Sequence, residues 1–124
     1  MESLRRRADF LSVAKGQRVS RPGFVLQARR AEGDENTAAR GDRPPRFGFT
    51  VTKKTGNAVV RNRIRRRLRE AVRRTALAAE AATDYVIVGR RAALTLQFER
   101  LVTDLESGFA ALTRGRADRA NGPS

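Results

Sequence analysis

The chain has 124 residues, a formal net charge of +14 and an isoelectric point near 11.8, so we expect one compact domain whose partner is a polyanion. It contains no Cys, which excludes disulfides, Cys-based zinc sites and thiol nucleophiles. It also contains no His, the commonest general base and metal ligand.

The first elements alternate between helix and strand patterns. Residues 4–15 have apolar side chains at helical spacing, and Gly16 is a plausible stop. Residues 23–29 read as a strand with apolar side chains on one face, and a further strand between residues 17 and 30 is left open. Residues 31–45 are polar and rich in turn formers, which predicts a flexible loop between two strands.

The second half continues the alternation. Residues 46–54 alternate as a strand, with Phe47, Phe49 and Val51 on one face. The turn at Thr55-Gly56-Asn57 leads into a helix, and we expect this helix to fray over residues 76–83, with Asn57 or Thr55 as its cap. A short apolar run at residues 84–89 predicts a buried strand.

The last predicted element is a helix at residues 94–113, where large apolar side chains recur every three or four positions. From Arg114 onward no apolar residue is larger than Ala, so we expect a disordered tail over 114–124. The domain itself should span residues 1–113. Its elements favour one small sheet with helices packed on it, an α/β sandwich.

The segment from Lys53 to Arg74 carries ten basic residues and one acid, Glu70. At about 100° per residue, one stripe is aliphatic: Val60, Ile64, Leu68, Ala71 and Val72. The opposite side is polar and basic: Asn62, Arg66, Arg69 and Arg73, with Arg65 beside them. Guanidinium groups match phosphate oxygens and stack on bases, so the pattern predicts a helix with one core face and one nucleic-acid face. An ordinary solvated cationic face is the alternative.

The acidic residues do not suggest a metal-dependent nuclease. Such enzymes need carboxylates that converge on divalent ions, whereas the acids here are scattered along the chain. For Glu70, a weak helix ion pair with Arg66 or Arg74 is a sufficient explanation. No apolar run approaches the roughly 20 residues that span a bilayer, and no signal peptide is visible, so we expect a cytoplasmic protein with no membrane partner.

The second face of the predicted sheet is small and polar. It carries Val25, Gln27, Arg29, Gly48, Thr50 and Thr52. Small polar side chains leave room for an extended ligand, although simple solvent exposure would explain the same pattern.

The stretch KKTGNAVVRNRIRRRLREA resembles the signature of the bacterial ribonuclease P protein subunit. The matching positions are Lys53, Lys54, Gly56, Asn57, Ala58, Val59, Arg61, Asn62, Arg63, Arg65, Arg66 and Arg69. RRRADFLSVAKGQRVSRPGFVLQAR, RFGFTVTKK and DYVIVGRRAA resemble further segments of that family, in the same order along the chain.

This resemblance implies an α+β fold of the ribosomal protein S5 domain 2-like type, with the order α-β-β-β-α-β-α and a left-handed βαβ crossover. It also implies a function. The protein would bind the catalytic RNA subunit, one protein per RNA, and the 5′ leader of precursor tRNA. The RNA would carry out the hydrolysis, with magnesium held through the RNA and holoenzyme. No residue of this chain is then expected to be catalytic.

The resemblance assigns two groups of site residues. Those expected to contact the RNA subunit are Arg61, Asn62, Arg63, Arg65, Arg66, Arg69 and Arg73. Those expected to form the cleft for the precursor-tRNA leader are Phe10, Ala14, Val25, Gln27, Thr50, Lys53 and Lys54.

The chain departs from the family at two cleft positions. The family often carries aromatic residues where this chain has Ala14 and Gln27. Leader contact is therefore expected to depend more on Phe10 and on backbone charge. The alternative function is that of a structural RNA-binding protein of ribosomal type, with no role in cleavage.

Overall fold

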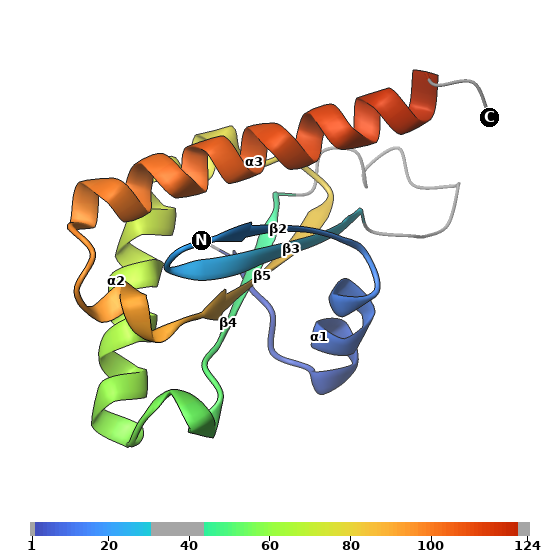
Figure 1. Ribbon diagram of the computed structural model, residues 1–124. Coiled ribbons are helices and arrows are strands. Elements are labelled where there is room, and N and C mark those ends of the chain that lie inside the picture. The colour runs from blue at the N-terminus through green and yellow to red at the C-terminus, as the bar shows by residue number, and fades with distance from the viewer. Residues whose placement is uncertain (1, 31–43, 122–124) are drawn as a thin grey trace.

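A computed structural model describes residues 2–30 and 44–121 of the protein. These residues form a mixed sheet with helices on both faces (Figure 1). The strands are β1 (Glu2–Ser3), β2 (Gln17–Arg21), β3 (Phe24–Arg30), β4 (Arg46–Thr50) and β5 (Thr83–Gly89). The helices are α1 (Arg7–Ala14), α2 (Ala58–Thr75) and α3 (Phe98–Asn121), with short 3-10 helices η2 (Lys53–Thr55), η3 (Ala76–Ala78) and η4 (Arg91–Leu94).

The sheet has the strand order β1-β4-β5-β3-β2. β4 pairs with β5 in parallel and β1 with β4 in parallel, whereas β3 pairs antiparallel with both β5 and β2. The parallel neighbours β4 and β5 are joined through α2, which makes a βαβ unit at the centre of the fold. The mixed α+β class and the predicted element order are confirmed, and β2 is the further strand that the sequence left open.

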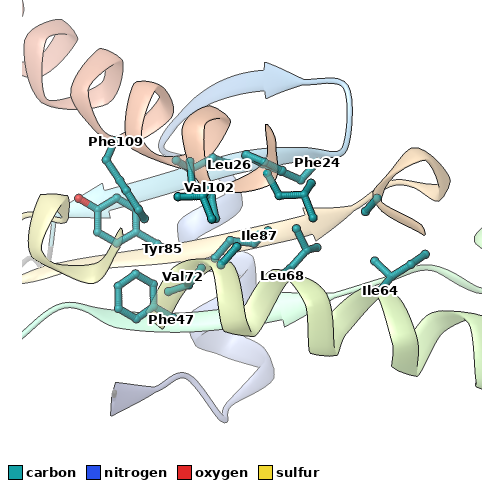
Figure 2. Packing of buried hydrophobic residues seen from close by; sticks show 14 of the residues in the cluster. Phe24, Leu26, Phe47, Ile64, Leu68, Val72, Tyr85, Ile87, Val102 and Phe109 are labelled. Atoms are coloured by element: carbon teal, nitrogen blue, oxygen red, sulfur yellow. The ribbon is translucent and has the colours of Figure 1, made fainter. Parts of the chain in front are cut away.

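The larger core lies between the sheet and the pair α2 and α3. Ile64, Leu68 and Val72 follow one another along α2 and lie on the sheet (Figure 2). At one end of this core, the Phe47 and Tyr85 rings stack at 5.6 Å between centroids, and Phe109 of α3 meets the Tyr85 ring edge-on at 4.9 Å. The Tyr85 hydroxyl accepts a hydrogen bond from the Glu80 amide at 2.9 Å, so this buried ring leaves no unsatisfied hydroxyl.

The opposite sheet face is covered by α1. A small cluster of Leu4, Val13 and Val86, with Phe10 and Val88 packed against it, holds α1 on β3 and β5. Gly16 follows α1 where the chain passes close to β3, and a Cβ there would lie 2.1 Å from the Ala28 carbonyl oxygen, so this position requires glycine. The expectation of a small and polar second face was therefore only partly right, since part of this face is a second apolar core.

Several predicted boundaries differ from the structure. The first helix starts at Arg7 instead of residue 4, because Leu4 donates its N–H to the Phe47 carbonyl and extends the pairing of β1. β4 ends at Thr50, and Lys53 and Lys54 lie in η2. After α2, only the three residues of η3 are helical, and a left-handed backbone at Ala82 (φ 56°) follows.

The end of the chain differs as well. α3 continues to Asn121, beyond residue 113 where we expected the helix to stop and a disordered tail to begin. After residue 113 the chain has no large apolar residue, so the periodic pattern that predicted the helix ends there. Ala and Arg, which recur in this segment, are strong helix formers, so helix propensity continues. The predicted loop at 31–45 lies mostly outside the described residues, and so do residues 122–124 of the tail.

Candidate nucleic-acid interface

The basic helix α2 is fixed at its N-terminus and along its apolar stripe. The Asn57 side-chain oxygen accepts the Val60 N–H at 3.0 Å, which makes Asn57 the cap. Ile64, Leu68, Ala71 and Val72 of the predicted stripe are all buried, and Val60 is partly buried. This packing turns the opposite side of α2 toward solvent, as predicted.

The arginines of α2 fall into groups with different environments. Arg63 and Arg66 are exposed, and within residues 3–30 and 44–114 neither has a hydrogen-bond or ion-pair partner. Both guanidinium groups are therefore free to bind phosphate. They lie on the same outer face as Asn62, Arg69 and Arg73, so five of the seven residues expected to contact an RNA subunit are exposed on one face of α2.

Three other arginines of α2, Arg61, Arg65 and Arg69, contact neighbouring groups of the protein itself. Arg65 donates to the Asn62 side-chain oxygen at 2.9 Å, and Arg61 donates to the Gly56 carbonyl at 3.1 Å. The Arg69 guanidinium lies 5.3 Å from the centroid of the Phe49 ring. These contacts leave most N–H groups of each side chain unused, so the arginines are oriented but still able to donate.

Glu70 pairs with Arg73 at 2.8 Å rather than with Arg66 or Arg74. Both side chains of this pair are about half exposed, so its contribution to stability is small. The pairing leaves Arg66 free, and Arg74 instead pairs with Glu99 of α3 at 2.8 Å.

Arg67 and Arg74 point to the other flank of α2 and bind the segment that leads into α3. Arg67 donates to the carbonyl oxygens of Leu94 and Leu96 at 2.7 and 2.6 Å. The Arg74 guanidinium lies 5.4 Å from the Phe98 ring centroid. The carbonyl and ring partners of these two arginines lie outside α2, so spacing within the helix could not show them.

A groove of about 520 Å³ opens between α1 and the sheet. It is lined by Arg5, Arg7, Phe10, Leu11, Ala14, Gln27, Phe49, Thr50 and Val86. The sheet register explains its floor, because Gln27 of β3 pairs with Val86 of β5, and Val86 pairs with Gly48 of β4. The groove is thus mainly apolar, with an amide and a hydroxyl on the sheet and two guanidinium groups at α1.

Four of the seven residues expected in the leader cleft line this groove: Phe10, Ala14, Gln27 and Thr50. Val25 faces the same side of the sheet and pairs with Val88, but it is not part of the lining. Lys53 and Lys54 are exposed on η2, which follows β4 after two residues. Sequence reasoning missed Arg5, Arg7, Leu11, Phe49 and Val86 as groove residues.

The acidic residues that the structure describes are spread over the molecule and pair mainly with arginines. In the part of the chain that the structure describes, no three acidic side chains gather so that they could hold a metal ion. Four carboxylates are instead engaged by arginines: Glu70 with Arg73, Asp84 with Arg46, Glu99 with Arg74, and Asp104 with Arg100. The donor set of the described residues therefore does not fit a protein-bound divalent cation. Across the same residues, no helix combines the length and apolarity that crossing a bilayer requires.

A small α+β protein with an arginine-covered helix and a separate groove has the features of an RNA-binding protein. The chain belongs to the ribonuclease P protein family, because the family model for Ribonuclease P matches residues 1–113. Membership makes it a protein component of an endoribonuclease that acts in tRNA processing, with RNA as its partner.

Relatives and solved structures agree with this assignment. The chain is 49% identical over 109 residues to the ribonuclease P protein component of Brucella suis, covering 87% of this chain and 77% of that protein. It is 47% identical over 116 residues to the component of Paramagnetospirillum magneticum, covering 92% and 82%.

The solved structures cover most of the chain at lower identity. The Staphylococcus aureus RNase P protein matches with a TM-score of 0.68 and 27% identity, over 90% of this chain and 94% of that one. The Thermotoga maritima RNase P protein matches with a TM-score of 0.68 and 27% identity, over 92% and 97%.

Proposed function

We propose that this protein binds the RNA subunit of ribonuclease P through the outer face of α2 and the 5′ leader of precursor tRNA in the groove beside α1. The RNA subunit carries out the phosphodiester hydrolysis, and one protein serves each RNA, in the cytoplasm. The observation that supports this proposal most strongly is that α1 and α2 lie on opposite faces of one sheet (Figure 1). The groove beside α1 is mainly apolar, whereas the outer side of α2 carries exposed arginines.

The outer face of α2 suits a folded RNA. It is long, convex and rich in exposed guanidinium groups, and Arg63 and Arg66 have no partner among the described residues. Phosphates of a structured RNA lie on its surface, so a convex cationic helix can reach several of them without opening base pairs. The proposed contacts are those of Arg61, Asn62, Arg63, Arg65, Arg66, Arg69 and Arg73.

The groove suits a single strand. An apolar floor with the Phe10 ring at one wall can accept unpaired bases, which stack on aromatic rings and bury their faces. Gln27 and Thr50 offer hydrogen-bonding groups that a base edge or a 2′-hydroxyl can use. The bases of a double helix are paired and stacked inside it and cannot lie on an apolar floor, so the ligand we propose for the groove is the leader. Lys53 and Lys54 would contact its backbone beyond the groove.

Magnesium enters this proposal through the RNA. The described residues do not supply a carboxylate cluster, so phosphates of the RNA subunit and the substrate would hold the ions that assist hydrolysis. The protein's own part is to add positive charge and to hold the leader, which reduces repulsion in the assembled complex.

The test is reconstitution of the full chain with the ribonuclease P RNA of the same organism at limiting magnesium. We expect the protein to increase cleavage of precursor tRNA at its mature 5′ end, and we expect the protein without RNA to cleave nothing. If added protein leaves cleavage at limiting magnesium unchanged, the proposal is wrong and a purely structural RNA-binding role takes its place.

A further inference from the structure

Among the described residues that line the groove, only two are charged, and both lie on one side. Arg5 lies in the segment that joins β1 to α1 and Arg7 is the first residue of α1, while the remaining lining residues are apolar or neutral. A nucleic-acid strand has the same asymmetry, with flat bases on one side and regularly spaced phosphates on the other. The positions of Arg5 and Arg7 therefore indicate on which side of the groove the phosphates of a bound strand would lie.

The two arginines are held in place by their neighbours. Leu4, directly before Arg5, is 6% exposed, packs with Val13 and Val86, and donates its N–H to the Phe47 carbonyl at 2.8 Å. Arg7 is the first residue of α1, and the amides of Asp9 and Phe10 both donate to the Arg6 carbonyl. The backbone is thus anchored on each side of Arg5 and Arg7, so their side chains start from fixed points on the rim.

Neither guanidinium is used by the protein itself. Both side chains are exposed, and among the described residues neither has a hydrogen-bond or ion-pair partner. Many other arginines differ in this respect: Arg21, Arg29, Arg67, Arg90 and Arg91 each donate to a backbone carbonyl or side-chain oxygen. Arg5 and Arg7 therefore resemble the unpartnered Arg63 and Arg66 of α2 more than they resemble these structural arginines.

Their position is also unfavourable for the stability of α1. The N-terminus of a helix carries partial positive charge, so cations in or next to the first turn are unfavourable. Arg5, Arg6 and Arg7 occupy the residues around the start of α1, and the N-cap residue Arg6 makes no side-chain cap hydrogen bond. The first turn also holds one acid, Asp9, which the three cations outnumber. An excess of positive charge at a helix start without a side-chain cap does not help folding, which favours a role in binding an anion.

We propose that Arg5 and Arg7 form a phosphate clamp on the α1 rim of the groove, binding consecutive backbone phosphates of the leader while its bases face Phe10 and the sheet. This inference rests on the proposed function of the groove as the leader site. It adds the orientation of the strand, because phosphates at the α1 rim place the bases toward β4, β5 and β3. It also adds two specific contacts beyond the cleft residues expected from the family resemblance.

The experiment uses the holoenzyme with two substrates, a precursor tRNA with a full-length leader and one whose leader is trimmed to its last nucleotide. Dissociation constants are measured against monovalent salt for Arg5→Ala, Arg7→Ala and the control Arg114→Ala. The control removes one exposed charge from α3, on the sheet face opposite the groove. A contact with one phosphate of a single strand contributes about 0.7 to the slope of log K against log salt.

We expect Arg5→Ala and Arg7→Ala each to lower that slope by about 0.7 with the full-length leader, with a smaller effect on the trimmed leader. Arg114→Ala should leave the difference between the two substrates unchanged. Equal losses on both substrates would overturn the clamp, because they would place these arginines against the RNA subunit or the tRNA body. Unfolding temperatures at or above that of the unmodified protein would confirm that each variant is folded.

A second measurement locates the phosphates. Leaders that carry one neutral methylphosphonate at a time are compared on the unmodified protein and on the Arg5→Ala/Arg7→Ala variant. We expect one or two adjacent positions where the neutral linkage weakens binding to the unmodified protein but not to the variant. Equal losses on both proteins at every position would refute the clamp. The proposed function fails separately, if the unmodified holoenzyme binds full-length and trimmed leaders equally well.

Discussion

The ring of Phe10 lies against the backbone of Gly48, where α1 crosses the central strands. A Cβ on Gly48 would lie 2.6 Å from both Cε1 and Cζ of Phe10, so the absence of a side chain at Gly48 is what allows the ring to approach the sheet. The contact leaves Phe10 partly exposed in the groove while its edge is supported from below. A supported ring is a suitable platform for a base, because its position is fixed before the ligand arrives.

We predict that Phe10→Ala weakens binding of precursor tRNA more than binding of mature tRNA. Stacking of one base on an aromatic ring contributes about 1–3 kcal/mol, so the loss specific to precursor tRNA should be roughly 5- to 150-fold. Equilibrium binding of both tRNAs to the holoenzyme measures it. Phe10→Leu is the control for lost packing of α1 on the sheet, and it should show most of the same discrimination loss because a leucine cannot stack. Equal losses for the two tRNAs would remove Phe10 from the leader site.

Gly48→Ala should act through Phe10. The nearest atoms to the new methyl group belong to the far end of a side chain, so we expect the ring to be displaced at a modest cost of about 1 kcal/mol in unfolding free energy. Displacement of the ring should also reduce the preference of the holoenzyme for precursor tRNA over mature tRNA. In the double variant Gly48→Ala/Phe10→Ala, we expect no further loss of discrimination beyond that of Phe10→Ala. Additive losses would show that Gly48 and Phe10 act independently.

The adjacent residues Arg66 and Arg67 should give opposite results. Arg66→Ala removes an exposed charge without a partner, so we expect weaker RNA binding, a salt slope lower by about 0.7–0.9, and a stability change within about 0.5 kcal/mol. Arg67→Ala removes two hydrogen bonds to the Leu94 and Leu96 carbonyls, so we expect a loss of about 1–3 kcal/mol in unfolding free energy. Chemical denaturation and salt-dependent RNA binding, run on both variants, measure the two effects. An unchanged salt slope for Arg66→Ala would mean that Arg66 faces solvent in the complex.

Substitutions at Asn57 should separate helix capping from RNA binding. Asn57→Ala loses the hydrogen bond from the Val60 amide, with an expected cost of about 1 kcal/mol. Asn57→Asp keeps a cap of similar strength, so its unfolding free energy should stay close to that of the unmodified protein. The added negative charge should nevertheless weaken RNA binding, because Asn57 begins the helix that we propose to contact the RNA subunit. Unweakened binding by Asn57→Asp would place the start of α2 away from the RNA.

The parts of this molecule that sequence predicted well are those whose signal is local. The aliphatic stripe of α2 and its Asn57 cap lie within one helix, so spacing alone was sufficient to place Ile64 and Leu68 in the core. The groove required more, because its lining joins α1 to three strands that are distant in sequence. Family resemblance supplied four of its residues.

The residues that sequence missed depend on contacts between elements. β1 has only two residues, too few to show any period, so the anchoring of Leu4 and the placement of Arg5 could not be read from the pattern. Arg66 and Arg67 look alike in sequence, and the difference between them comes from carbonyl groups at positions 94 and 96. The end of α3 was predicted too early because the prediction relied on large apolar residues. The helix continues after the last of them, where helix propensity remains.

The paired side chains on α2 have a consequence for the entropy of binding. Long side chains such as arginine lose up to about 2 kcal/mol of rotamer freedom when they become fixed. Arg61, Arg65 and Arg73 already contact Gly56, Asn62 and Glu70 in the free protein, so part of that freedom is lost during folding rather than at the moment of binding. Arg63 and Arg66, which have no such partners among the described residues, would still lose theirs when an RNA binds. One helix thus presents both a pre-ordered and a mobile set of guanidinium groups, and the pre-ordered set lowers the entropic cost of recognising a rigid RNA surface.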